Sequence, residues 1–149
     1  PSRRAREQHS RPFRRALAEK ICPIAASVRA VSADAKIIVA GDFNDYTTSE
    51  SVRMVCASGF TDVSAKAVGQ NGARATYKYR GEWRSLDHIL VSTSMMPDVR
   101  LCRVHDARFL LVEDEKYGGV QPRRNYLGPR WRDGFSDHLP LVAEFALDE

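Results

Sequence analysis

Apolar residues between positions 12 and 31 recur every three or four positions, which is the period of an amphipathic helix. Ser10 is placed to cap this helix, and Pro12 fits its first turn. Because a proline inside a helix removes a backbone hydrogen bond, Pro23 is expected to kink or split it. The residues on the apolar face are Phe13, Leu17, Ile21, Ile24 and Val28.

A strand and a second helix are predicted to follow. Residues 36–40 form a short, largely β-branched run that ends at a glycine, which predicts a strand buried on both faces. Thr47 and Glu50 have the spacing of a capping box, so we predict a helix that begins there and reaches Ser58. Gly59 provides the stop signal of this helix.

Beyond the second helix the pattern changes to short strands. Turn residues at 80–81 and 97–98 separate them, and residues 113–134 are rich enough in Gly, Pro and charge to predict one long loop. The sequence holds no internal repeat and no linker, so all elements are assigned to one domain. The predicted strands are residues 75–79, 85–91, 100–103, 108–112 and 139–145.

The composition is that of an ordinary globular domain, with 149 residues, 43% of them hydrophobic and 28% charged. It excludes collagen-like and disordered chains, and no apolar run approaches the ~20 residues of a transmembrane helix. No signal peptide is recognised, and the first residue, Pro1, leads us to expect a processed chain or a fragment. Cys22, Cys56 and Cys102 lack metal-binding spacing and are expected as thiols, with one disulfide left open.

The net charge of +4 is concentrated at the N-terminus. Residues 1–20 hold seven Lys or Arg and two Glu, whereas the remainder holds 16 basic and 17 acidic residues. This basic arm, residues 1–20, either binds a polyanion, such as nucleic acid or a phospholipid surface, or is an ordinary solvated helix face.

Polar side chains suited to catalysis stand at the ends of three predicted strands. Asp42 and Asn44 directly follow the first strand, where they face one cleft or form an Asx turn. Asp87 lies in an apolar strand, where an unpartnered charge is costly, and the adjacent His88 points to the opposite face. A carboxylate followed by His138 enters the last strand, and this pair suits metal coordination or proton transfer.

Three motifs, GDFN at 41–44, SLDHILVS at 85–92 and SDHLP at 136–140, resemble the endonuclease/exonuclease/phosphatase superfamily, which has the deoxyribonuclease I-like fold. TYKYRGEW at 76–83 and the loop at 126–131 resemble a bacterial branch of it. The resemblance implies an α+β fold that forms half of a four-layered α/β sandwich, with a mostly antiparallel sheet and flanking helices.

Residues 1–149 are then a single, incomplete domain that corresponds to the C-terminal portion of the family's domain. Pro1-Ser2-Arg3 resembles the tail of a His-Trp-Pro-Ser-Arg motif of the N-terminal half, and the family's principal Glu metal ligand has no counterpart here. We expect the missing N-terminal half, or a second chain, to cover the exposed sheet face.

The resemblance implies a role for each candidate residue. Asp42 orients or deprotonates the attacking water, and Asn44 holds the scissile phosphate or that water. His138 contacts the phosphoryl oxygens and transfers a proton, and Asp87 fixes its tautomer. Asp137, together with Asp42, binds a divalent cation, and hard oxygen ligands of this kind favour Mg²⁺ or Mn²⁺.

Two arginines and three aromatic residues are candidates for substrate contact. Arg124 and Arg130 lie on the predicted long loop, where they either grip a substrate phosphate or are solvated. Tyr77, Tyr79 and Trp83 either stack on a base or sugar ring or pack at the rim of a strand.

The sequence therefore predicts a metal-dependent phosphoester hydrolase, whether phosphodiesterase, nuclease or phosphatase. Its substrate is expected to be nucleic acid, a phospholipid head group or a small phosphoester. Without the Glu ligand the isolated chain is expected to bind Mg²⁺ weakly and to have little activity. The alternative is a catalytically silent module that uses the same fold to bind nucleic acid or phospholipid.

Overall fold

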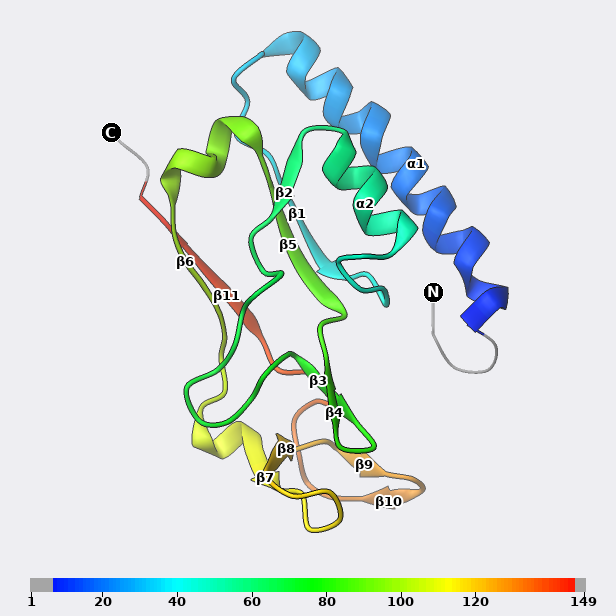
Figure 1. The fold of residues 1–149 in the computed structure, drawn as a ribbon, viewed down its shortest axis with the longest axis vertical. Helices are drawn as coiled ribbons and strands as arrows, with labels where there is room; N and C mark the ends of the chain where they lie inside the picture. The colour runs from blue at the N-terminus through cyan, green and yellow to red at the C-terminus, as the bar shows by residue number, and fades with distance from the viewer. Residues whose placement is uncertain (1–6, 147–149) are drawn as a thin grey trace.

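Two helices, α1 (Glu7–Val31) and α2 (Glu50–Ala57), lie against one face of a three-stranded sheet (Figure 1). The computed structural model describes residues 7–146. In pairing order, the strands of this sheet are β1 (Ile38–Asp42), β5 (Asp87–Ser92) and β2 (Phe60–Asp62). Both pairs are antiparallel, and β5 is central.

The remaining strands form four antiparallel pairs. The 3₁₀ helix η1 (Thr93–Asp98) connects β5 to β6 (Val99–Val104), which pairs with β11 (Leu141–Phe145). Three small hairpins lie together at the end of the molecule drawn at the bottom of Figure 1. They are β3 (Tyr77–Tyr79) with β4 (Glu82–Arg84), β7 (Leu111–Glu113) with β8 (Val120–Pro122), and β9 (Tyr126–Leu127) with β10 (Arg130–Trp131), with the 3₁₀ helix η2 (Arg108–Leu110) before β7. The expected α+β, mostly antiparallel fold is confirmed.

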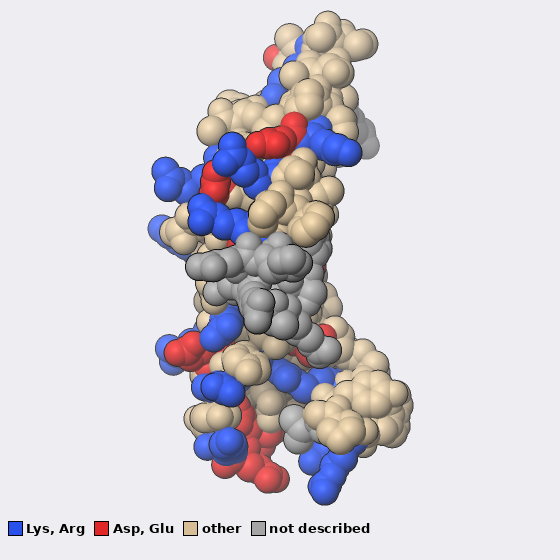
Figure 2. Space-filling view, turned by 90° about the vertical axis from the view of Figure 1, so that its right-hand side faces the viewer, with Lys and Arg blue, Asp and Glu red and all other residues tan. Residues whose placement is uncertain are grey.

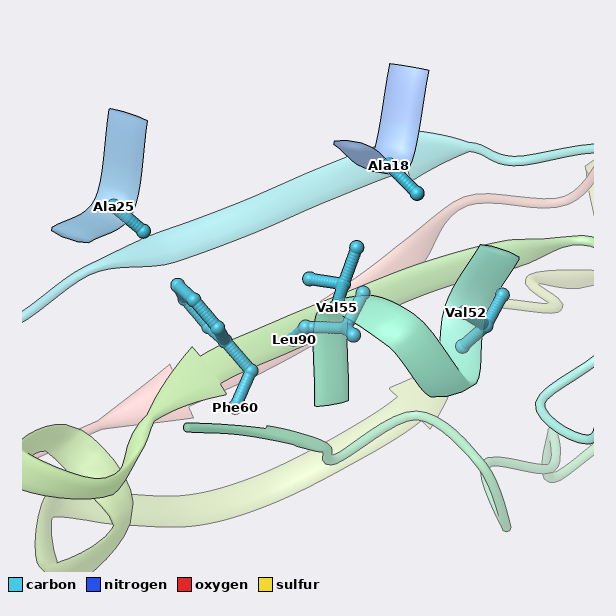
Figure 3. Packing of buried hydrophobic residues seen from close by; sticks show 6 residues of the cluster. All are labelled: Ala18, Ala25, Val52, Val55, Phe60 and Leu90. Carbon is cyan, nitrogen blue, oxygen red and sulfur yellow. The ribbon is translucent and has the colours of Figure 1, made fainter. Parts of the chain in front are cut away.

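The main core lies between the helices and the three-stranded sheet. Ala18 and Ala25 project from α1 toward this core (Figure 3), and their small side chains let the helix approach the sheet closely. Full burial of an aliphatic side chain such as Leu90 contributes about 1.5–3 kcal/mol. The six buried residues are Ala18, Ala25, Val52, Val55, Phe60 and Leu90. A second, smaller cluster of Ala67, Ala73, Val104 and Leu139 supports the hairpin end.

Helix α1 differs from its prediction at Ser10 and at Pro23. It already includes Glu7, so Ser10 lies inside the helix and its hydroxyl accepts a hydrogen bond from Nη1 of Arg14 (2.6 Å). Pro23 does not split the helix, which continues to Val31. The buried alanines on either side of Pro23 hold both halves against the same core, and packing therefore outweighs the lost backbone hydrogen bond.

The predicted capping box of α2 is wrong. The Thr47 hydroxyl donates to the Asp62 carboxylate (3.0 Å) instead, and the helix begins at Glu50, after Ser49. A tertiary acceptor on β2 thus replaces the local partner. The predicted stop is confirmed, because Gly59 has a φ of +91°, a conformation that glycine adopts without strain.

The first strand is not buried on both faces, as predicted, and it spans 38–42 rather than 36–40. Ile38 is 45% exposed, and Val39 is the β1 side chain that packs against the core. Within the described residues β1 pairs only with β5, so it is an edge strand. A strand at an edge can have the sequence of a central one, because burial depends on its neighbours.

The region predicted as one long loop, 113–134, contains β8, β9 and β10. A buried ion pair ties it to β3, since Nζ of Lys78 lies 2.8 Å from the Asp114 carboxylate. The same ammonium donates to the carbonyls of Gly118 and Val120. These strands have only two or three residues, too few for an alternating pattern to be recognised.

The basic N-terminal region is not a continuous cationic patch in the described residues. Arg11 and Arg15 both form ion pairs with Glu50, at 2.8 and 3.1 Å, and Arg15 also pairs with Glu19. Figure 2 shows acidic side chains among the basic ones on this face. The ordinary solvated face is therefore favoured for this part of the arm, whereas residues 1–6 lie outside the described residues. Cys22, Cys56 and Cys102 are all thiols.

No helix among residues 7–146 is both long enough and apolar enough to cross a membrane.

Candidate active site

Three of the predicted site residues converge where β1 and β5 meet the loop before β11. The antiparallel register places Asp42 directly opposite Asp87. His138 is brought to them by a β-bridge to Tyr77 and by the Leu139 N–H, which donates to the Thr76 carbonyl (2.8 Å). One ligand atom from each of Asp42, Asp87 and His138 lies within 4.8 Å of the others.

Asp87 holds the imidazole of His138 in one orientation. Nδ1 of the ring lies 2.7 Å from the Asp87 Oδ2 atom, which also accepts a hydrogen bond from the Thr76 hydroxyl. Since the ionised carboxylate is an acceptor, Nδ1 carries a proton and Nε2 is left for a ligand. Burial lowers the pKa of His138, but the hydrogen bond to Asp87 and the negative charges of Asp87, Asp42 and Asp137 outweigh burial and raise it.

Asp42 and Asn44 form a closed polar turn at the end of β1. The Asn44 backbone N–H and its side-chain Nδ2 each donate to the Asp42 carboxylate at 2.8 Å. The φ of Asn44 is +51°, a left-handed conformation that asparagine tolerates better than most residues. The Asx turn considered from the sequence is present, and it places Asp42 beside Asp87 and His138.

A buried network anchors this turn from behind. The Asp45 carboxylate accepts hydrogen bonds from Nε of Arg14 (2.7 Å) and from the Ser51 hydroxyl (2.5 Å). The Asp45 carbonyl lies 2.7 Å from Nε2 of His88, whose Nδ1 lies 2.8 Å from the Asp62 carboxylate. Both neighbours of the ring are acceptors, and burial, which lowers the pKa of His88, is outweighed by these hydrogen bonds, so its pKa is raised. His88 thus faces away from the candidate site, as the strand alternation predicted.

The sequence profile of the Endonuclease/Exonuclease/phosphatase family matches residues 1–146, nearly the whole chain. The chain belongs to the endonuclease/exonuclease/phosphatase family. The resemblance carried by the motifs at 41–44, 85–92 and 136–140 is therefore confirmed. Members of this family are hydrolases of phosphoester bonds and generally depend on a divalent metal.

Three solved structures share its fold. A family member from Bacteroides thetaiotaomicron is 20% identical with a TM-score of 0.58, over 89% of this chain and 44% of that chain. A mannosyl-6-phosphatase from the same species is 21% identical with a TM-score of 0.58, over 90% and 46%. A Bacteroides vulgatus family member is 18% identical with a TM-score of 0.53, over 91% and 44%.

The chain spans less than half the length of each of those three proteins. At these identities the likeness shows the deoxyribonuclease I-like fold alone, in agreement with the architecture expected from the motifs. No curated protein sequence matches the chain.

The other predicted site residues lie further out. Asp137 is exposed and does not belong to the group within 4.8 Å, although its charge acts on His138. Arg130 is exposed on β10 and forms no ion pair with any residue in 7–146. Arg124 is half-buried, its Nη2 donates to the Lys78 carbonyl (2.7 Å), and its guanidinium lies 5.8 Å from the centre of the Tyr77 ring. Of the two arginines, Arg124 therefore neighbours the site.

Sequence reasoning missed Thr76 as a neighbour of the Asp87–His138 pair, and it named Tyr77 only as a possible stacking residue. The Thr76 hydroxyl donates to Asp87, and the Tyr77 ring centre lies 4.8 Å from that of His138. The signal was indirect, because a carboxylate within an apolar strand requires donors from adjacent elements, and Thr76 lies in the strand predicted at 75–79. Trp83, by contrast, packs against the second core cluster, which agrees with the packing role considered for it from the sequence.

The acid sensitivity of folding is expected to depend on Asp62. Burial raises the pKa of this carboxyl, but hydrogen bonds from His88, Ser64 and Thr47 outweigh burial and lower it below the unfolded value of about 4. Asp62 therefore stabilises the fold above the unfolded pKa, and this stability is lost as the pH falls through the folded pKa. Asp62→Asn should be less stable than wild type at pH 7 in urea unfolding.

The difference between Asp62→Asn and wild type should shrink as the pH falls below about 4, because wild-type Asp62 then becomes neutral as well. Asp34→Asn, at an exposed position before β1, is the matched control and should follow the wild-type curve throughout. Equal losses of stability in wild type and Asp62→Asn on acidification would contradict the role assigned to this carboxylate.

Proposed function

We propose that the chain forms the catalytic face of a divalent-metal-dependent phosphoester hydrolase. The observation that carries the proposal is the convergence of Asp42, Asp87 and His138 within 4.8 Å. A binding module has no need of an imidazole whose tautomer is fixed by a half-buried carboxylate. Such an arrangement is suited to moving a proton at one defined nitrogen.

The donor set fits a hard cation. Asp42 lies next to the Asp87–His138 pair, and the charges of Asp42 and Asp137 both act at His138. We propose that Asp42 and Asp137 hold Mg²⁺ or Mn²⁺, because carboxylate oxygens suit these ions. The bound cation would neutralise phosphate charge during attack by water.

The residues of this chain would divide the proton transfers between them. Asp42 accepts a proton from the attacking water as the new bond to phosphorus forms, and Asn44 holds the phosphate or that water. In its doubly protonated form, His138 gives the Nε2 proton to the leaving oxygen as its bond to phosphorus breaks, while the Nδ1 proton stays in the hydrogen bond to Asp87. Arg124 is proposed to contact phosphoryl oxygens from the neighbouring loop, with Arg130 further out.

We also propose that a further part of the natural protein, or a second chain, completes the site. The edge of β1 is open, and several large apolar side chains along α1 are exposed although their spacing predicts an apolar face. The similar structures are about twice as long, which leaves room for such a covering part. The exposed apolar residues include Phe13, Leu17, Ile24 and Val28, at 61%, 50%, 64% and 42%.

The test is hydrolysis of a generic phosphodiester and a generic phosphomonoester by the intact protein, with Mg²⁺ and with EDTA. We expect turnover with Mg²⁺, its loss in EDTA, and recovery when Mg²⁺ is returned in excess. His138→Gln is the control for contaminating phosphatases and should lose turnover. Activity that persists in EDTA would contradict metal dependence.

No turnover of either ester, together with tight binding of nucleic acid or phospholipid, would instead support the silent binding module. The preferred ester separates phosphodiesterase or nuclease activity from phosphatase activity. The same set of assays therefore separates a hydrolase from a binding module and a phosphodiesterase from a phosphatase.

A further inference from the structure

The β3–β4 hairpin carries two tyrosine rings next to the candidate site. Tyr77 and Tyr79 are two positions apart in β3, and their ring centres are 6.5 Å apart with planes inclined by 9°. Tyr77 also stands 4.8 Å from the His138 ring, and Tyr79 is 41% exposed. The two rings are therefore nearly parallel, with Tyr77 beside His138 and Tyr79 exposed to solvent.

Three guanidinium groups border these rings. Arg80 and Arg84 lie 5.3 and 5.2 Å from the Tyr79 ring centre, and Arg124 lies 5.8 Å from that of Tyr77. We call this set the hairpin platform, and it consists of Tyr77, Tyr79, Arg80, Arg84 and Arg124. It combines stacking surfaces with cations, which is the composition of a site for a flat, anionic ligand.

The positive charge of the platform is only partly neutralised. Arg84 pairs with Glu82 (3.1 Å), an exposed residue, whereas Arg80 and Arg124 have no carboxylate partner among residues 7–146. In addition, the Nε atoms of Arg84 and Arg124 are buried without a hydrogen-bond partner. Unused donors and excess charge at one place indicate that an anionic group is missing from it.

Arg80 occupies a backbone conformation that does not suit it. Its φ is +51° and that of Gly81 is +85°, the two left-handed positions of a tight hairpin turn, where Asn or Gly at the first position is usual. An arginine there is not explained by folding, since asparagine would make the same turn with less strain. Its guanidinium against Tyr79 gives it a use in binding.

We propose that the hairpin platform binds the nucleobase of a nucleotide whose scissile phosphate lies at His138. A nucleobase stacks on tyrosine rings and on guanidinium planes alike, and its phosphates supply the missing anions. A sugar ring has no π-face to offer a guanidinium plane. The proposal rests on the proposed function for the position of the phosphate, and it names nucleotide phosphodiesters as the substrate class.

Binding without turnover tests the platform separately from catalysis. The probes are the thymidine dinucleotide TpT and the same phosphodiester with abasic sugars, titrated into the intact protein in EDTA and followed by NMR. We expect TpT to bind about ten-fold more tightly than the abasic diester. Tyr79→Leu should weaken TpT binding by about the same factor and leave binding of the abasic diester unchanged.

Arg80→Asn is the second variant, because it relieves the turn and does not endanger the fold. We expect weaker TpT binding by roughly three-fold, with a melting temperature at or above that of wild type. The matched control is Tyr126→Leu, at an exposed tyrosine that contacts Trp131 on another hairpin. It should bind TpT as wild type does.

Equal binding of TpT and the abasic diester, or unchanged TpT binding in both variants, would overturn the platform even if chelator-sensitive hydrolysis is found. Tighter binding of mannose 6-phosphate than of TpT would overturn it in favour of a sugar phosphate. Conversely, base-dependent TpT binding that both variants weaken would support the platform even if no ester is hydrolysed, in which case the hydrolase proposal fails alone.

Discussion

Replacing Asp42 with asparagine is expected to lower kcat for the proposed Mg²⁺-dependent hydrolysis by about 1,000-fold in the intact protein. Asparagine has nearly the same shape, and its carbonyl can still accept the hydrogen bond from the Asn44 backbone N–H. It carries no negative charge, however, so it neither accepts a proton from water nor attracts a cation. Asp42 is exposed, and the melting temperature should therefore change little.

The control for this variant is Asp34→Asn, which makes the same chemical change at an exposed position outside the site. Its kcat and KM should equal those of wild type. Full activity in Asp42→Asn, measured against an inactive His138→Gln preparation, would remove Asp42 from the proposed proton transfer.

Arg14→Met should reduce the free energy of unfolding by about 3–5 kcal/mol. The Arg14 and Asp45 side chains are only 4% and 8% exposed, and Nε of Arg14 lies 2.7 Å from the carboxylate. Methionine fills much of the same volume but leaves the Asp45 charge buried with only the Ser51 hydroxyl as a side-chain donor. Such a loss is a large fraction of the stability of an ordinary domain, about 5–15 kcal/mol, and urea unfolding measures it directly.

Arg15→Met provides the comparison on the same helix. Arg15 and its partners Glu19 and Glu50 are 54%, 52% and 39% exposed, so losing these ion pairs should destabilise the chain far less than Arg14→Met does. If Arg14→Met destabilised the chain no more than Arg15→Met, the ion pair behind the site would not hold the 42–45 turn in place.

Local patterns predicted the elements well where a helix or strand is long. The three- and four-residue spacing located α1, and alternation located the strands that became β5, β6 and β11. The errors have non-local causes. Ile38 is exposed because β1 has a neighbour on one side only, and Thr47 leaves its cap position for a carboxylate 15 residues away.

In the candidate site, too, local motifs were predictable and non-local contacts were not. Asp42, Asp87 and His138 could be selected because each stands at a strand end in a recognisable motif. Thr76 could not, and neither could the position of Tyr77 beside His138, since both depend on β3 lying against the loop before β11. No pattern along the loop distinguishes Arg124 from Arg130; the fold does, by turning one toward Tyr77 and leaving the other exposed on β10.

Strand β5 carries two adjacent residues that each join an aspartate–histidine pair, on opposite faces of the sheet. Asp87 faces His138 and His88 faces Asp62. A slip of β5 by one residue would exchange these faces and bring the Asp87 carboxylate against Asp62, two like charges with no cation between them. The buried Asp62–His88 pair thus makes this misaligned pairing of β5 costly, and it favours the register that places the candidate catalytic carboxylate on the correct side.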